Sequence, residues 1–133
     1  MSAGAERVLV DTSAWIEAIR ERGDRATRAR VEELVLAGQA RLCDFVLLEL
    51  WNGARSHEDE ETLRRIEADV ERVETTAATW VRARRLAREA RAAGLTTPAA
   101  DLLVFACAAE HGLELLHRDA HLDRLARLAP VRK

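Results

Sequence analysis

The sequence has almost no lysine: the 21 basic residues include a single one, Lys133, at the last position. A mechanism that depends on a catalytic lysine is therefore disfavoured. Only two cysteines are present, Cys43 and Cys107, and they lie in apolar contexts without a Cys-x-x-Cys pair or zinc-type spacing. We expect both to be reduced and buried, as free cysteines usually are.

Long hydrophobic runs are also missing. No apolar stretch approaches the roughly 20 residues that a membrane span requires, and residues 1–7 are too short and polar for a signal peptide. We therefore expect a soluble protein of a reducing cytoplasm, with no membrane as partner. The formal net charge is −2, from 21 basic and 23 acidic side chains, which excludes a histone-like polycation and leaves nucleic acid open as a partner.

Length and composition indicate one globular domain over residues 1–133. The chain has 48% hydrophobic and 33% charged residues, which is a globular composition and is enough for one core. No internal repeat, low-complexity tract or linker divides it.

Strand and helix patterns alternate along the chain. Short apolar runs predict strands at 8–10, 41–43, 73–75 and 113–117, with an edge strand at 130–131. Between them, apolar residues at helical spacing predict helices around 12–22, 31–37, 45–51, 57–70, 77–93, 98–112 and 122–128. We expect Thr12 and Ser13, Asp44, and Thr97 to cap three of these helices. The order predicts an α/β fold, with a central, mainly parallel sheet and helices on both faces.

Four carboxylates stand apart from the acids of the solvated helix faces. Asp11 ends the first strand and Asp119 follows the last clear strand, where open α/β sheets gather their ligand sites. Glu49 lies within the apolar segment 45–51, and burial of its charge is costly unless it is paired or binds a metal. Asp101 lies one turn into a helix, whose positive end favours a carboxylate.

Each of these acids has a structural explanation when taken alone. Asp11 and Asp119 are possible helix N-caps, Asp101 a first-turn acid, and Glu49 the one polar position of its helix. Four together indicate a shared site, and converging carboxylates need a positive partner. Their oxygen ligands suit Mg²⁺ or Mn²⁺, which lowers the pKa of a bound water and stabilises charge on a phosphoryl oxygen.

Two hydroxyl residues, Thr12 and Ser13, follow the first of these acids directly. They would orient the Asp11 carboxylate or a metal-bound water, as residues just outside a metal site often do. The alternative is simple helix capping, and the two roles are compatible.

The segments that carry the four acids resemble PIN-domain ribonucleases, specifically the VapC toxins of type II toxin–antitoxin systems. The matching segments, in the family's order and at similar spacing, are VLVDTSAWI (8–16), FVLLELWNG (45–53), TPAAD (97–101) and LLHRDAHLD (115–123). The resemblance implies a PIN-like three-layer fold and a homodimer. It also implies a Mg²⁺- or Mn²⁺-dependent endoribonuclease that hydrolyses RNA phosphodiesters with a metal-activated water, and a small VapB-like antitoxin as partner.

The resemblance also assigns roles to individual residues. The acidic quartet, catalytic and metal-binding, is Asp11, Glu49, Asp101 and Asp119, and Ser13 is the small hydroxyl residue two places after the first acid. The sequence departs from the family pattern at His117, where many relatives have Thr or Ser. Asp123 is an alternative fourth acid, and Asp119 is preferred because it lies nearer the strand end.

Arginines and apolar helix residues are the candidates for contacts with partners. The candidates for RNA binding are Arg84, Arg88 and Arg91 on one helix face and Arg25 and Arg28 on another. The more ordinary explanation is that these are solvated helix faces whose arginines pair with nearby acids. The candidates for an antitoxin groove or a dimer contact, as against core packing, are Trp15, Ile16, Leu50 and Trp51.

Other functions of the same fold class fit the sequence less well. A receiver domain needs a lysine at its acidic site, and a phosphatase of the haloacid dehalogenase type needs an Asp where this chain has Ser13. A non-catalytic PIN-like binding module and another metal-dependent phosphoryl-transfer enzyme remain alternatives.

Overall fold

A four-stranded parallel sheet forms the centre of the molecule in the computed structural model, which describes residues 6–128. The strand order is β3-β2-β1-β4. Every pairing in it is parallel, and β1 lies between β2 and β4. The strands are β1 (Val8–Val10), β2 (Ala40–Cys43), β3 (Glu71–Val73) and β4 (Glu114–Leu116).

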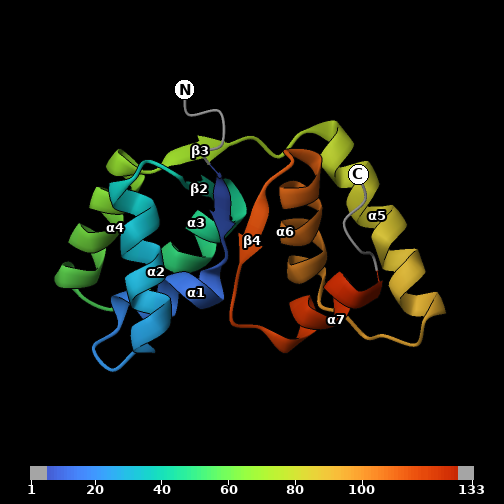
Figure 1. Ribbon diagram of the computed structural model, residues 1–133, viewed down its shortest axis with the longest axis horizontal. Coiled ribbons are helices and arrows are strands. Elements are labelled where there is room, and N and C mark those ends of the chain that lie inside the picture. Colours follow the sequence, from blue (N-terminus) through green and yellow to red (C-terminus); the bar gives the residue numbers. More distant parts are fainter. Residues whose placement is uncertain (1–5, 129–133) are drawn as a thin grey trace.

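Helices connect the strands, because parallel neighbours cannot be joined by a tight turn. In the described part of the chain they are α1 (Thr12–Ile19), α2 (Arg25–Leu36), α3 (Asp44–Asn52), α4 (His57–Asp69), α5 (Ala77–Ala92), α6 (Ala99–Glu110) and α7 (Ala120–Leu128). Figure 1 shows α1, α2 and α4 on one side of the strands and α5, α6 and α7 on the other. The expected α/β fold is therefore confirmed. None of the described helices is both long and apolar enough to cross a bilayer.

Two groups of buried apolar side chains hold these layers together. The larger group surrounds β1, in which Leu9 and Val10 are fully buried, and includes side chains of α1, α2, α3 and α6. The smaller joins α5, α6 and α7, and its members Leu122 and Leu125 are fully buried. Leu115 of β4 packs against both groups. Leu115 therefore links the packing around α7 to the core around the strands.

Two predicted helix caps differ from the structure. The N-cap of α1 is Asp11, whose side chain accepts a hydrogen bond from the backbone N–H of Ser13, so Thr12 and Ser13 lie inside the helix. The N-cap position of α3 is Cys43, and Asp44 is the first helical residue. Asp11 is therefore the N-cap that its structural explanation predicted, whereas Asp44 lies one residue inside its helix because β2 ends at Cys43.

Several predicted boundaries also shift: the helix predicted around 31–37 begins at Arg25, and the helix predicted around 12–22 ends at Ile19. Thr97 was the predicted N-cap of α6, but Pro98, with φ −59° and ψ 144°, takes that position. The helix therefore begins at Ala99, one residue later than predicted. The strand predicted at 73–75 shares only Val73 with β3, which runs from Glu71 to Val73 because α4 already ends at Asp69. The edge strand predicted at 130–131 lies outside the described residues.

The two cysteines are free and buried, as predicted. They come from different elements, Cys43 at the end of β2 and Cys107 in α6. A hydrogen bond between their side chains lowers the pKa of Cys43 and raises that of Cys107.

Candidate metal centre and active site

The four singled-out acids lie at the end of the sheet where β1 and β4 finish. These two strands run side by side, with Val10 opposite Leu116. Asp11 follows β1 directly, and Asp119 follows β4 after a short loop. Glu49 comes from α3 and Asp101 from the first turn of α6. The charges of the other three acids all act on Asp101, so the structure brings the four together.

Asp11 is buried, with 4% of its surface exposed, which is unusual for an acidic residue. Its Oδ2 accepts hydrogen bonds from the Ser13 backbone N–H at 3.0 Å and from the Ser13 hydroxyl at 2.6 Å. The Ser13 hydroxyl oxygen in turn accepts one from the backbone N–H of Arg118 at 2.9 Å. Ser13 therefore ties the carboxylate after β1 to the loop after β4. The other oxygen of Asp11 accepts no hydrogen bond from residues 6–128.

Glu49 is held by the other predicted hydroxyl. Thr12 Oγ1 donates a hydrogen bond to Glu49 Oε1 at 2.5 Å, across 37 positions of sequence. We expected Thr12 to orient Asp11, its neighbour, whereas the structure directs its hydroxyl to Glu49. Within the described chain, Glu49 thus has one anchored oxygen and one without a hydrogen bond, as Asp11 does. Each carboxylate is fixed in place and keeps an oxygen available for a ligand.

Asp101 shows the electrostatic character of the site most clearly. It is 9% exposed, and burial together with the negative charges of Asp119, Asp11 and Glu49 raises its pKa from 3.8 to about 6. The nearby His121 acts in the opposite direction. At neutral pH the Asp101 carboxylate is still mostly ionised, so the site concentrates negative charge that a bound cation would neutralise.

Asp119 is the fourth acid of the site, and its side chain also caps the N-terminus of α7. Its Oδ1 accepts hydrogen bonds from the backbone N–H groups of His121 at 2.7 Å and Leu122 at 3.4 Å. The His121 ring lies beside it, with Nδ1 3.4 Å from Asp119 Oδ1 and 3.7 Å from Asp101 Oδ2. One ligand atom from each of these three side chains falls within 4.8 Å of the others. The structure therefore has a cluster of acidic and histidine residues of the kind that holds a metal ion.

His121 was missed when the sequence alone was considered. Its signal was present, because it lies two residues after Asp119 at the start of a helix that Asp119 caps. That spacing turns the ring back toward the acid. The sequence gives no comparable signal for its closeness to Asp101.

His117, the departure from the family pattern, supports the same loop. Its Nδ1 accepts a hydrogen bond from the backbone N–H of Asp119 at 3.2 Å. Its Nε2 lies 3.7 Å from Asp123 Oδ1, and the Asp123 side chain is 62% exposed. Asp123 is not among the groups that shift the pKa of Asp101. The geometry therefore favours Asp119 over Asp123 as the fourth acid.

Arg118, also missed from the sequence, anchors the loop between β4 and α7. Its Nη1 lies 2.8 Å from Asp24 Oδ2 and donates a hydrogen bond to Thr27 Oγ1 at 3.1 Å. These contacts join the loop to the start of α2. The pKa of Asp24 is lowered mainly by its hydrogen bonds with Thr27, and Arg118 lowers it further.

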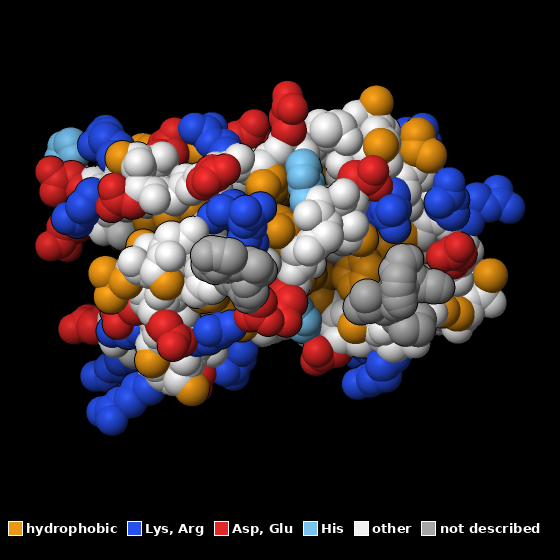
Figure 2. Space-filling model, turned by 45° about the horizontal axis from the view of Figure 1, so that its top comes forward, with side chains coloured by type: hydrophobic (Ala, Val, Ile, Leu, Met, Phe, Trp, Pro, Cys, Tyr) orange, Lys and Arg blue, Asp and Glu red, His pale blue; other side chains and the backbone are white. Residues whose placement is uncertain are grey.

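The predicted substrate-binding arginines share an exposed face of α5. Its three members are Arg84, Arg88 and Arg91, and none of them forms an ion pair with any residue of 6–128. The buried side of α5 carries Thr79, Ala83, Leu86 and Ala90. Arg25 is likewise exposed, whereas Arg28 donates to the backbone carbonyl of Arg20. Figure 2 shows basic side chains spread among acidic ones, without a continuous basic patch on the face in view. No described contact links the α5 face to the four acids.

The apolar candidates for partner contacts divide between core and surface. Trp15 and Leu50 are buried in the larger core group, and Trp51 is partly buried, with its Nε1 donating to Glu67 Oε1 at 3.0 Å. Ile16 is 41% exposed, and Leu48 of α3, which we had not singled out, is 63% exposed.

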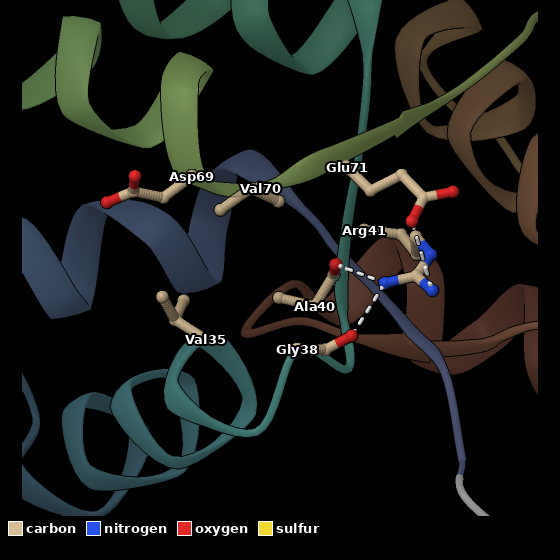
Figure 3. Close-up of a pocket in the computed structure, with 7 residues that line it drawn as sticks. All are labelled: Val35, Gly38, Ala40, Arg41, Asp69, Val70 and Glu71. Carbon is tan, nitrogen blue, oxygen red and sulfur yellow. Dashed lines mark hydrogen bonds and ion pairs between the residues drawn. The ribbon is translucent and has the colours of Figure 1, made fainter.

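A pocket of about 130 Å³ lies at the other end of the sheet, where β2 and β3 begin (Figure 3). Arg41 dominates it, donating to the carbonyl oxygens of Gly38 at 3.0 Å and Ala40 at 2.9 Å and lying 3.5 Å from Glu71. The guanidinium group of Arg41 is therefore engaged by neighbouring groups of the pocket. None of the four acids lines this pocket.

Comparison with known proteins gives consistent matches along the chain. The family model described as the PIN domain matches residues 8–128. Ribonuclease VapC11 of Mycobacterium tuberculosis is 34% identical over 125 residues, which are 91% of this chain and 92% of that protein. Ribonuclease VapC21 of the same species is 33% identical over 90% of this chain and 86% of its own length.

Solved structures give the same picture of the fold. FitAcB of Neisseria gonorrhoeae aligns with a TM-score of 0.72 and 20% identity, over 90% of this chain and 93% of that one. VapBC2 of Rickettsia felis, solved bound to a DNA fragment from its promoter, aligns with a TM-score of 0.74 and 18% identity, over 89% and 92%.

Proposed function

Because the chain belongs to the PIN-domain family, we propose that residues 1–133 form one PIN domain that acts as the VapC-type toxin of a type II toxin–antitoxin system. Its activity is that of an endoribonuclease, which hydrolyses phosphodiester bonds of RNA. Curated relatives that bear the name VapC ribonuclease, 34% identical over nine tenths of both chains, support the proposal.

The observation that carries the proposal is the convergence of three other carboxylates on that of Asp101. Burying one carboxylate next to three others is costly, as the pKa of about 6 reflects. Proteins keep such arrangements where the charge has a use, and a cation site is the use that this donor set fits. A mere structural role for Asp101 would be served at lower cost by a neutral residue.

The donor set fits a hard divalent cation, Mg²⁺ or Mn²⁺. Asp11 and Asp101 would be its principal ligands, and Glu49 and Asp119 would complete the site directly or through water. The chemistry that such a cation supplies when bound is the activation of water and the neutralisation of charge on the phosphoryl oxygens.

The protein's own residues hold this site ready. Ser13 and Thr12 each fix one oxygen of an acid, at 2.6 Å and 2.5 Å, so that the carboxylates keep their positions despite mutual repulsion. Both hydroxyls are engaged in these bonds, and both thiols are buried. The site therefore offers no obvious protein nucleophile, and the attacking group in this proposal is a water.

The expected partners follow from the same proposal. RNA would bind at the carboxylates, with the exposed arginines Arg84, Arg88 and Arg91 as candidate phosphate contacts. A VapB-like antitoxin would hold the toxin inactive in the cytoplasm, as the toxin–antitoxin complexes among the structural relatives support. Exposed Ile16 and Leu48 offer apolar surface for that antitoxin or for the second copy of a homodimer.

The test is cleavage of total RNA by purified protein with Mn²⁺ or Mg²⁺, for the wild type and Asp11→Asn. We expect the wild type to cleave and Asp11→Asn to lose the activity, because one oxygen of Asp11 would bind the metal. Asp123→Asn is the matched control, since it removes a carboxylate that stands apart from the four. Equal cleavage by wild type and Asp11→Asn would show that the site does not perform the reaction.

A further inference from the structure

We propose that His121 is a nitrogen ligand of the metal bound at the carboxylate site, and that it makes the site favour Mn²⁺ over Mg²⁺. The inference rests on the proposed function, because it takes the metal site of the PIN domain as given. It adds an imidazole to the all-oxygen set formed by Asp11, Glu49, Asp101 and Asp119.

The position of the ring supports this role. His121 Nδ1 lies 3.4 Å from Asp119 Oδ1 and 3.7 Å from Asp101 Oδ2. Neighbouring ligands of one octahedral cation at metal–ligand distances near 2.1 Å are about 3 Å apart. Both distances from the ring nitrogen are therefore within about 1 Å of the spacing of adjacent ligands, and one ligand atom from each of the three side chains lies within 4.8 Å of the others.

The backbone at His121 is held firmly while its ring stays accessible. Its N–H is bound by Asp119 Oδ1 at 2.7 Å, and the next residue, Leu122, is fully buried in the smaller core group. The ring itself is 42% exposed, and its only polar contacts with residues 6–128 are the two carboxylates. The polar neighbours of the His121 ring in this part of the chain are thus the same oxygens that a cation would share.

The other described histidines near this end of the chain are engaged elsewhere. His117 accepts the Asp119 backbone N–H through Nδ1 and faces Asp123 with Nε2. The ring of His111 contacts the backbone carbonyl of Glu74. His121 is therefore the histidine that the geometry points to, and His117 is the rival nitrogen that a test has to separate from it.

The choice of metal follows from ligand chemistry. Mg²⁺ strongly prefers oxygen and retains its waters, whereas imidazole suits transition metals. Replacing an oxygen ligand by a histidine nitrogen penalises Mg²⁺ more than Mn²⁺. If His121 served only as a counter-ion of the metal-free carboxylates, a bound cation would displace it. The site would then show no preference for Mn²⁺ over Mg²⁺.

Pulsed electron paramagnetic resonance of the Mn²⁺-loaded protein tests the ligand directly. A coordinated imidazole gives a ¹⁴N modulation of the spin echo, which oxygen ligands do not give. We expect this modulation in the wild type and in His117→Asn, and its loss in His121→Asn and His121→Gln. Circular dichroism of the two His121 variants checks that both are folded.

Calorimetric titration of the same proteins measures the preference. We expect His121→Asn to bind Mn²⁺ about tenfold more weakly, the lower end of what changes around a metal site cost, and to bind Mg²⁺ within about twofold of the wild type.

The outcomes separate this inference from the proposed function. If the wild type binds Mn²⁺ without a ¹⁴N modulation, or if the modulation survives in both His121 variants, His121 is not a ligand and the carboxylate site still stands. The inference is likewise overturned if Mg²⁺ and Mn²⁺ affinities fall equally. If the wild type binds neither ion, both the metal site and the inference fail.

Discussion

Replacing Asp101 by asparagine should stabilise the metal-free protein even though it removes a proposed metal ligand. Asp101 is 9% exposed, and its pKa is raised to about 6, first by burial and then by the charges of Asp119 and Asp11. Asparagine has nearly the same shape and carries no charge. The substitution therefore removes the repulsion while leaving the packing at the start of α6 in place.

The sign and the size of the effect follow from linkage. An acid whose pKa rises on folding binds protons more tightly in the folded state, so the free energy of unfolding falls as the pH rises from about 4 to about 6. The loss is complete about one pH unit above the folded-state pKa of about 6. A shift from 3.8 to about 6 corresponds to at most about 3 kcal/mol, at 1.36 kcal/mol per pH unit.

The assay is urea denaturation in a chelator at pH 8 and at pH 4. At pH 8 we expect Asp101→Asn to unfold at a higher urea concentration than the wild type, and at pH 4 the two should nearly coincide. The control Asp123→Asn removes an exposed acid of α7, 62% exposed, and should show no comparable gain. Addition of Mn²⁺ should then stabilise the wild type and leave Asp101→Asn almost unchanged.

Two results would refute this reasoning. One is an Asp101→Asn protein no more stable than the wild type at pH 8, which would mean that the four carboxylates do not repel one another in solution. The other is a gain of the same size at pH 4, which would assign the stabilisation to helix propensity or packing rather than to charge.

Three further predictions concern the surroundings of the site. Ser13→Ala removes the hydroxyl between Asp11 and the loop after β4, and should lower the free energy of unfolding by about 1–3 kcal/mol and weaken Mn²⁺ binding in calorimetry. Ser13→Thr should restore both, and unchanged Mn²⁺ binding by Ser13→Ala would contradict the positioning role. Leu122→Ala leaves a cavity beneath α7 and should cost about 2–5 kcal/mol in urea denaturation; a loss below 1 kcal/mol would mean that α7 is loosely packed. Replacing the α5 arginines Arg84, Arg88 and Arg91 by alanine should weaken RNA binding and reduce its dependence on salt concentration. An unchanged salt dependence would show that this face does not contact RNA.

The parts of the fold that the sequence predicts best are those where an apolar run meets an isolated acid. β1 is buried on both faces and reads as an unbroken apolar run that ends at Asp11. Asp101 stands out in the same way, directly before the apolar stretch of α6. Such positions are visible without a structure because the strand or helix pattern fixes where the acid must lie.

Other features depend on contacts between distant segments, which no local pattern encodes. Thr12 lies beside Asp11 in the sequence, yet its hydroxyl binds Glu49, 37 residues away. The start of β3 was predicted late because Glu71 and Arg72 are exposed at the edge of the sheet and give no apolar signal. His121 escaped notice because its closeness to Asp101 arises only when α7 packs against α6.

The site draws its carboxylates from positions 11, 49, 101 and 119, nearly the whole described chain. A ribosome delivers these residues in that order, and N-terminal segments begin to fold first during synthesis. β1 is made first but cannot pair with β4 until residues 114–116 have emerged. A nascent chain therefore carries an incomplete site for most of its synthesis. The mRNA under translation is exposed to the complete set of acids only when β4 and α7 have folded.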